Sequence, residues 1–262
     1  MESNSFKGRT AVVTGGARGI GDAIVQAMRA AGAAVVSLDK IEPEEARAGV
    51  RYLETDVSDP RSVETAFAAL DSAGEAPDIL VNNAGIQRVG LIGKLPFEEW
   101  QAVIGTHLSG FFLCASQAVP RMLQRAKGGA IISIASTAAY VGMPGRGPYC
   151  AAKAGIMGLT RALALEVASA NIRVNAIAPG YTRTRLVEEG IENGSLKEEW
   201  MLERVPMGRL AAPAEIAGIA CFLASDAAAY ITGQVITADG GWTIQGQGRA
   251  PGWLTAGPSA EH

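Results

Sequence analysis

The fold expected of this chain is decided by residues 10–21, which read TAVVTGGARGIG. The first five residues are apolar or β-branched and predict a short buried strand. Beyond residue 21, apolar residues follow a helical spacing, at Ile24, Val25 and Met28. Glycines at positions 15, 19 and 21 lie between the expected strand and the expected helix. Glycine lets the backbone approach a diphosphate at a helix N-terminus. The stretch therefore predicts a strand, a phosphate-binding turn and a helix.

The same alternation of strand and helix continues along the chain. Further strands are expected at residues 33–39, 50–57, 78–85, 129–136, 171–180 and 234–241. Helices are expected at 42–48, from 58 to about 70, from Phe97 past Phe111, from Tyr149 and from Pro213. This pattern predicts an α/β fold: a Rossmann-type, doubly wound, parallel seven-stranded sheet with helices on both faces. We expect one domain spanning residues 1–262.

Composition excludes several classes of protein. Hydrophobic residues make up 48% of the chain and the net charge is −3, which argues against disorder and against a nucleic-acid surface. No apolar run reaches the length of a membrane span, and the first residues lack the apolar core of a signal peptide. Cys114, Cys150 and Cys221 are widely spaced and read as reduced thiols. We expect a cytoplasmic protein without a metal site.

Asp39 bears on the choice of cofactor. It lies at the end of the second expected strand, 20 residues after Gly19. An acid at this place binds ribose hydroxyls and repels a 2′-phosphate, so we predict NAD rather than NADP. Lys40 or Arg18 could meet a phosphate and weaken that preference, and a solvated Asp39 is the alternative.

Tyr149 and Lys153 lie four residues apart in a stretch that reads as helical. Side chains at this spacing share one helix face. A cation near a phenol favours the phenolate, so we expect Lys153 to lower the pKa of Tyr149 and to fit it for proton transfer.

Five motifs occur in one order: Thr14-Gly15-x-x-x-Gly19-x-Gly21, Asn82-Asn83-Ala84-Gly85, Ser136, Tyr149-x-x-x-Lys153 and Pro179-Gly180. On these residues the chain resembles a short-chain dehydrogenase/reductase from about residue 6 to residue 242. The resemblance implies that Tyr149 exchanges a proton with the substrate oxygen, that Lys153 assists it and binds the nicotinamide ribose, and that Ser136 polarises the same oxygen. It implies cofactor-binding residues at several strand ends: Gly15, Arg18, Gly19, Ile20, Gly21, Asp39, Asp56, Val57, Asn83, Ala84, Gly85, Tyr149, Lys153, Pro179, Gly180, Thr182 and Thr184.

His107 departs from the family pattern. The family usually has Asn-x-x-Gly where this chain has His107-Leu108-Ser109-Gly110, and that Asn helps to hold a water linking the Lys to solvent. An imidazole can hold a water and titrates near neutral pH, so we expect His107 to be a catalytic residue in the relay. The alternative is that it only packs.

Arginines suggest the substrate. Arg88 and Arg146 are expected to bind it together with Ser136 and Tyr149, and Arg183 and Arg185 lie near the same rim. Arginine binds carboxylates bidentately, which favours an anionic small molecule. The loop from Asn82 to Arg88 also resembles that of gluconate 5-dehydrogenases and 2-keto-3-deoxy sugar-acid dehydrogenases, and Gln87 that of 3-hydroxybutyrate dehydrogenases.

The expected function is therefore NAD-dependent interconversion of a secondary alcohol and a ketone on a sugar acid or deoxy keto sugar acid. The alternatives are a sugar, polyol or 3-hydroxybutyrate dehydrogenase, a 3-oxoacyl-carrier reductase, or a catalytically silent dinucleotide-binding subunit. Residues 181–208 are a candidate substrate lid. The family is usually tetrameric, so we expect a homotetramer. The tail at 246–262 is either disordered or reaches a neighbouring subunit through Trp253.

Overall fold

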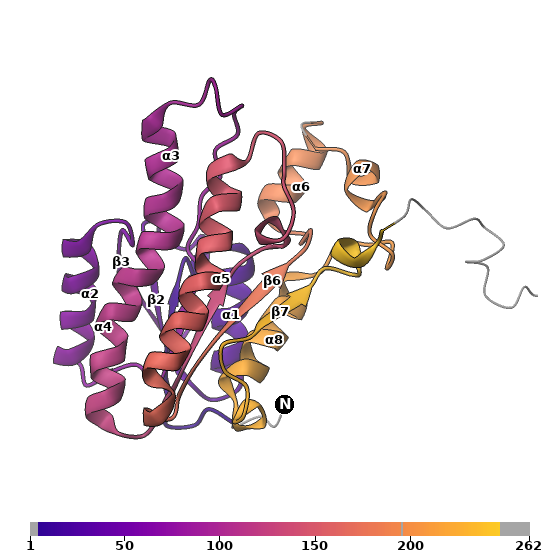
Figure 1. The fold of residues 1–262 in the computed structure, drawn as a ribbon. Helices are drawn as coiled ribbons and strands as arrows, with labels where there is room; N and C mark the ends of the chain where they lie inside the picture. Colours follow the sequence, from indigo (N-terminus) through magenta and orange to yellow (C-terminus); the bar gives the residue numbers. More distant parts are fainter. Residues whose placement is uncertain (1–4, 195, 247–262) are drawn as a thin grey trace, which may run out of the picture.

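The computed structural model describes residues 5–194 and 196–246, and it contains one sheet with seven parallel strands (Figure 1). The strand order is β3-β2-β1-β4-β5-β6-β7, which confirms the expected α/β class. The strands are β1 (Thr10–Thr14), β2 (Ala34–Asp39), β3 (Val50–Glu54), β4 (Ile79–Asn82), β5 (Gly129–Ile134), β6 (Ile172–Pro179) and β7 (Val235–Ala238).

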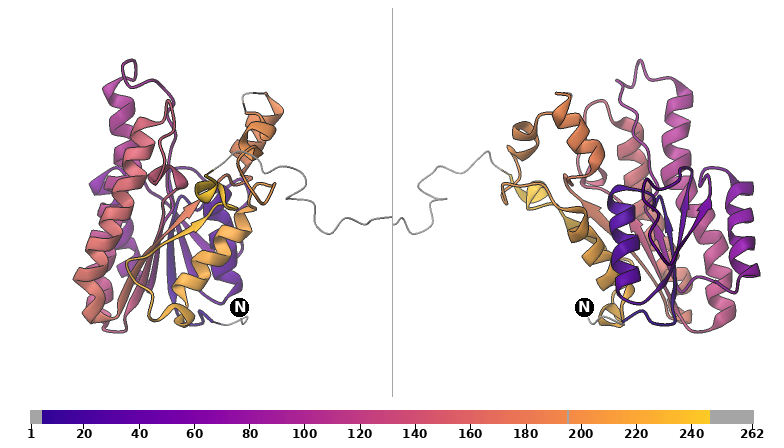
Figure 2. Two further views of the ribbon diagram at one scale, coloured as in Figure 1. Left: turned by 45° about the vertical axis from the view of Figure 1, so that its right-hand side comes forward. Right: turned by 180° about the vertical axis from the view of Figure 1, so that it is seen from behind.

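Helices cover both faces of the sheet, as the two views of Figure 2 show. Helices α2, α4 and α5 pack on one face, and α1 and α8 pack on the other. The α-helices are α1 (Gly19–Ala30), α2 (Pro60–Ser72), α3 (Phe97–Ile104), α4 (Gly110–Arg125), α5 (Gly147–Val167), α6 (Arg185–Glu192), α7 (Glu198–Leu202) and α8 (Pro213–Ala224). A π-helical turn, η1 (Gly105–Ser109), joins α3 to α4, and the 3-10 turns are η2 (Thr137–Ala139), η3 (Ala168–Ala170), η4 (Asp226–Ala228) and η5 (Trp242–Ile244).

The interior strand β1 shows how the sequence builds two cores. Val12 belongs to the core beneath α2, α4 and α5, whereas Ala11 and Val13 belong to the core beneath α1 and α8. Successive side chains of a strand point to opposite faces, so a strand buried on both faces must be apolar throughout. This is why residues 10–14 carry no alternation of polar and apolar residues.

Several expected boundaries were wrong. β3 ends at Glu54 instead of residue 57, β4 at Asn82 instead of residue 85, β5 at Ile134, before Ser136, and β7 at Ala238 instead of residue 241. Residues 42–48 are not helical; instead the Arg47 side chain bonds Asp22 of α1, and its backbone N–H donates to the Tyr52 hydroxyl. A segment this short is a marginal helix in isolation, and contacts with its neighbours decide its shape.

Residues 97–125 form a helix that is long and apolar enough, by length and composition alone, to cross a membrane. In the fold it lies along the sheet, with Val103, Phe111, Cys114 and Met122 buried in or beside the core. It is a core helix. Trp253 and the rest of residues 247–262 lie outside the described residues, so the expectations for the tail stay predictions.

Candidate active site

The glycine turn between β1 and α1 has a backbone that other residues would not tolerate. Gly15 and Gly19 have φ of +64° and +60°, in the left-handed region that favours glycine. A Cβ on Gly21 would lie 1.9 Å from the carbonyl oxygen of Gly15. The turn therefore presents bare backbone, flanked by Arg18 and Ile20, at the amino end of α1, where the helix dipole favours phosphate charge.

Asn83 and Ala84 hold this turn against the end of β4. The Asn83 amide donates to the carbonyl oxygens of Thr14 at 3.0 Å and Gly15 at 2.9 Å. The Thr14 hydroxyl accepts from the backbone N–H groups of Asn83 at 3.0 Å and Ala84 at 3.1 Å. The backbone N–H and both amide hydrogens of Asn83 are thus used in fixing the turn, which leaves its backbone carbonyl and its amide oxygen for a cofactor.

Asp39 reaches the same turn from the end of β2. Its carboxylate accepts from the backbone N–H of Ala17 at 3.0 Å and from that of Ile41 at 3.2 Å. These bonds fix a negative charge beside the phosphate-binding backbone. Asp39 therefore lies at the end of β2 against the glycine turn, and its role toward the ribose hydroxyls stays a prediction.

Lys40 is engaged elsewhere. Its ammonium lies 2.8 Å from the carboxylate of Asp56, which also accepts from the N–H and hydroxyl of Ser58 at 2.9 and 2.6 Å. Burial opposes ionisation of Asp56, but the bonds from Lys40 and Ser58 outweigh it and lower its pKa. Val57 is buried against Gly110. Lys40 thus has a partner in the protein other than a phosphate.

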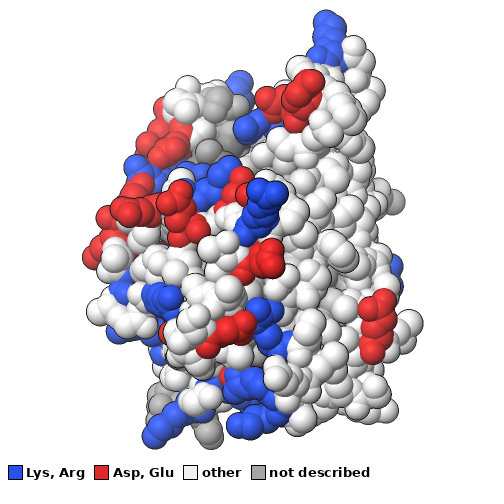
Figure 3. All heavy atoms as spheres, turned by 90° about the vertical axis from the view of Figure 1, so that its left-hand side faces the viewer, with Lys and Arg blue, Asp and Glu red and all other residues white. Residues whose placement is uncertain are grey.

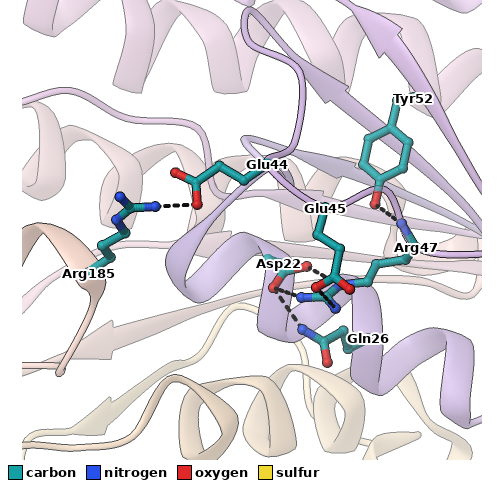
Figure 4. Close-up of polar contacts among 7 residues, drawn as sticks. All are labelled: Asp22, Gln26, Glu44, Glu45, Arg47, Tyr52 and Arg185. Atoms are coloured by element: carbon teal, nitrogen blue, oxygen red, sulfur yellow. Dashed lines mark hydrogen bonds and ion pairs between the residues drawn. The ribbon is translucent and has the colours of Figure 1, made fainter.

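The start of the expected lid segment contacts the connection between β2 and β3 (Figure 4). Arg185, the first residue of α6, forms an ion pair with Glu44 in the β2–β3 connection and another with Glu189 at 2.8 Å. A Cβ on Gly19 would lie 3.6 Å from the Thr184 methyl group, so the start of the lid rests on the glycine turn. Sequence reasoning missed Glu44, because nothing in a sequence marks a pair between distant surface loops.

The end of β6 borders the site from the other side. Pro179 is its last residue, and the N–H of Gly180 donates to Ala238 of β7 at 2.9 Å. Thr182 is buried and donates to the Gly180 carbonyl at 3.3 Å, while Thr184 begins the lid helix α6. These predicted cofactor residues therefore lie along one continuous segment.

Ser136, Tyr149 and Lys153 meet at the carboxyl ends of β5 and β6. The Ser136 hydroxyl caps η2 by accepting from Ala138 N–H at 3.1 Å. The Lys153 ammonium, 3% exposed, donates to the Ile134 carbonyl at 2.5 Å and lies 5.5 Å from the centre of the Tyr149 ring. Helix α5 thus brings the phenol and the ammonium to one place, as the spacing predicted.

The predicted direction of the Tyr149 pKa was wrong for the protein without ligands. Burial raises the pKa of Tyr149, while the Ser136 hydroxyl and the charge of Arg146 oppose the increase. Burial also lowers the pKa of Lys153 to about 7, because no carboxylate compensates its charge. The sequence supplied the neighbouring cation but not the depth at which both groups lie.

His107 lies in the π-helical turn η1, edge-on to the Tyr149 ring with centroids 5.3 Å apart. Its Nε2 lies 2.7 Å from the Ile86 carbonyl oxygen and 3.1 Å from the Ile86 amide nitrogen; a protonated Nε2 donates to the carbonyl, whereas the other neutral tautomer accepts from the amide N–H. Nδ1 is buried without a partner among the described residues. A Cβ on Gly85 would lie 2.2 Å from the imidazole, so the ring packs directly on that glycine.

Titration of His107 near neutral pH, which the relay hypothesis assumed, is contradicted. Burial and the charge of Lys153 lower its pKa to about 3, although the bond to Ile86 opposes this. His107 is therefore neutral at physiological pH. Its part in the relay stays a prediction, as a fixed neutral hydrogen-bonding group.

We expect His107→Asn to reduce the acid sensitivity of the fold. The folded-state pKa of about 3 lies below the ordinary value of 6.5, so only the unfolded state takes up this proton between those values. The parent should lose up to about 3 kcal/mol of stability through this group between pH 7 and 4.5, and nothing above pH 6.5. Urea unfolding at the two pH values measures it. Equal losses in parent and variant would contradict the buried neutral state.

Most of the rim arginines have carboxylate partners. Arg88 pairs with Glu99, Arg183 pairs with Glu198, and Arg185 pairs as described above. Arg146, at the start of α5, has no ion pair with any described residue. The group of four is therefore not equally available to a substrate.

Comparison with known proteins agrees with this geometry. Residues 15–243 match a family model described as enoyl-(acyl carrier protein) reductase. The 3-oxoacyl-acyl-carrier-protein reductase FabG of Chlamydia trachomatis is 43% identical over 248 residues, covering 89% of this chain and 96% of that protein. The FabG of Escherichia coli is 40% identical over 243 residues, covering 90% and 98%. The chain belongs to the short-chain dehydrogenase/reductase family.

A solved relative has the same fold over nearly the whole chain. It is provisionally named a 2-deoxy-D-gluconate 3-dehydrogenase, from Agrobacterium tumefaciens, and its structure contains NADP. Its TM-score is 0.85 at 36% identity, over 94% of this chain and all of that one (100%). This short-chain dehydrogenase/reductase is accordingly an oxidoreductase, and the family uses NAD or NADP. The bare glycine turn, Asp39 and the buried Lys153 suit such a dinucleotide.

Proposed function

We propose that this short-chain dehydrogenase/reductase interconverts a secondary alcohol and a ketone, with Tyr149 as its acid and base. The observation that carries the proposal is the buried Lys153 ammonium, which lies beside the Tyr149 ring without a carboxylate partner. Burying an unpaired charge costs stability, so such a group is more common at a functional site than in an inert core.

The roles follow from the geometry. The Ser136 hydroxyl can bond the substrate oxygen, and the Tyr149 hydroxyl donates a proton to that oxygen during reduction or accepts one during oxidation. Because burial raises the pKa of Tyr149, the free enzyme holds the protonated donor. The Lys153 charge stabilises the phenolate that remains after donation. A bound nicotinamide dinucleotide supplies or accepts the hydride.

The proposed cofactor is NAD. Asp39 supports this choice, since a carboxylate fixed at the glycine turn repels the 2′-phosphate of NADP. The engagement of Lys40 with Asp56 supports it further. The bound NADP of the Agrobacterium structure belongs to that protein.

Two substrate classes remain. The first is a small hydroxy acid of sugar type, supported by Arg146 at the rim and by the likeness to the Agrobacterium protein. The second is a 3-oxoacyl chain on a carrier, which is the substrate named for the FabG relatives at 40 and 43% identity. These relatives support the second class more directly than any comparison supports the first. Asp39 weighs against the second only if that reduction uses NADPH.

A substrate panel separates these candidates. The protein is assayed with NAD on gluconate, 3-hydroxybutyrate, glucitol and glucose, and with NADH or NADPH on acetoacetyl-CoA. We expect NAD-linked oxidation of at least one hydroxy acid, abolished by Tyr149→Phe. Turnover of acetoacetyl-CoA alone would establish the second class. No turnover of any compound would refute the proposed reaction for these classes.

We also propose a homotetramer in the cytoplasm. Helices α4 and α5 expose Phe112 (58%) and Leu165 (84%), and Figure 3 shows few charges on the side of the molecule where these helices lie. Exposed apolar surface of this kind suits a subunit contact. The cysteines, all free, suit a reducing compartment. Sedimentation analysis tests the assembly.

A further inference from the structure

Arg146 differs from the other rim arginines in having an uncommitted charge. Arg88, Arg183 and Arg185 each form an ion pair with a glutamate. A guanidinium that is already paired with one carboxylate gains little binding energy from a second carboxylate, because its forked N–H donors are occupied. Arg146 has neither an ion pair nor a side-chain hydrogen bond with any residue that the structure describes.

The backbone of Arg146 is firmly placed beside the catalytic tyrosine. It caps α5, its carbonyl accepts from Cys150 N–H at 2.9 Å, and its N–H donates to Met143 at 3.1 Å. The preceding Gly145 accepts from Gly90 N–H at 2.9 Å, which ties this loop to the one after β4. Arg146 precedes Tyr149 by three residues, or about 4.5 Å along a helix axis.

Arg146 is half-buried, and its charge is felt by two tyrosines. Its charge opposes the burial-induced rise in the pKa of both Tyr149 and Tyr181. Tyr181 follows β6 and stacks edge-on against Trp242 and Trp200, with centroids 5.9 and 6.3 Å apart. Arg146 is therefore a cation at the start of α5, and its charge acts both on Tyr149 and on Tyr181 of this aromatic group.

We propose that Arg146 is the residue that selects an anionic substrate, binding a carboxylate a few bonds from the carbon that Tyr149 serves. A partly desolvated, unpaired guanidinium binds a carboxylate more strongly than a fully solvated one does. This inference rests on the proposed alcohol–ketone reaction and names its substrate class: 2- or 3-hydroxy acids and the matching keto acids.

The test uses substrates matched in size that differ in charge. With NAD, 3-hydroxybutyrate is compared with 1,3-butanediol, and gluconate with glucitol, for the parent, Arg146→Gln, Arg146→Lys and Arg88→Gln. We expect Arg146→Gln to lower kcat/KM for the acids about 100-fold, mainly through KM, and to change it less than threefold for the neutral partners. Arg146→Lys should recover part of the loss, because it restores the charge without the fork.

A binding measurement complements the kinetics. Butyrate, which carries the carboxylate but no hydroxyl, should inhibit the parent competitively, and Arg146→Gln should raise its inhibition constant about tenfold. Thermal unfolding of each variant shows whether it remains folded. If Arg146→Gln is unfolded, the kinetics of Arg146→Lys and the inhibition of the parent by butyrate test whether Arg146 binds the carboxylate.

Several results would overturn the assignment. Equal losses on acids and neutral alcohols would make Arg146 structural, and a selective loss in Arg88→Gln instead would move the carboxylate site to Arg88. A parent that oxidises only neutral alcohols, or reduces only acetoacetyl-CoA, would refute Arg146 as a carboxylate site while leaving the alcohol–ketone reaction intact. A parent inactive on every compound would refute that reaction itself.

Discussion

Lys153→Met should lower kcat about 1,000-fold and, at the same time, should leave the melting temperature at pH 7 unchanged or raise it. The loss of activity follows because the phenolate of Tyr149 would form in a buried site without its cation. The gain in stability follows because Lys153 is 3% exposed and has no carboxylate partner in residues 5–194 and 196–246. Methionine fills similar space without a charge to desolvate.

The pH dependence of the stability gain identifies its cause. The pKa of Lys153 is about 7 in the folded protein against an ordinary 10.5, so between these values only the unfolded state holds the proton. Below pH 7 the buried ammonium lowers the free energy of unfolding of the parent by its full amount, which is at most about 5 kcal/mol. The parent should therefore become more stable, relative to the variant, as pH rises from 7 to 10.

Urea unfolding of the parent and the variant at pH 7, 8.5 and 10 measures this difference, and Tyr149→Phe is the matched control. Tyr149→Phe should lose activity to a similar degree but should not remove the alkaline stabilisation due to Lys153. If Lys153→Met is clearly less stable than the parent at pH 7, the bond to the Ile134 carbonyl outweighs the cost of burial and the argument is wrong.

Asp39→Ala should change the ratio of NAD to NADP specificity about 100-fold in favour of NADP. A carboxylate and a phosphate charge about 5 Å apart repel by roughly 3 kcal/mol at an effective dielectric constant of 20, which corresponds to about two factors of ten. The substitution removes this repulsion and also removes the acceptor for the ribose hydroxyls. NADP binding should therefore tighten while NAD binding weakens.

Calorimetric titration with NADH and NADPH, together with kcat/KM for both cofactors, measures the change. Asp39→Asn is the informative companion, because it keeps the shape and a hydrogen-bonding oxygen but loses the charge. Lys40→Ala should leave the ratio nearly unchanged, since Lys40 is engaged with Asp56. A parent that already prefers NADPH would contradict the assignment of NAD.

Sequence reasoning succeeded where the signal is local. The glycines of residues 15–21 are required by backbone geometry within one turn, and Tyr149 and Lys153 share a helix face because of their spacing. The apolar strands can be recognised in the sequence because both faces of a parallel sheet are buried and the runs are therefore apolar throughout. The positions of Asp39, Ser136 and His107 follow once those elements are assigned.

Properties set by burial or by distant partners could not be obtained this way. The sequence placed a cation near Tyr149 and so predicted a lowered pKa, but the depth of the site reverses the sign. It likewise predicted a titrating His107, whereas its environment keeps that imidazole neutral. The group of four rim arginines looked uniform until the structure showed Glu99, Glu198 and Glu44 against three of them.

The sequence by itself thus determined the fold, the family and the residues proposed for proton transfer, since these depend on period, spacing and steric limits of the backbone. Only the tertiary structure decided which charges are buried, which are neutralised and which remain available. Desolvation and ion pairing depend on what folding brings close in space, and no pattern along the chain encodes the distance between Arg185 and Glu44 or the isolation of Arg146.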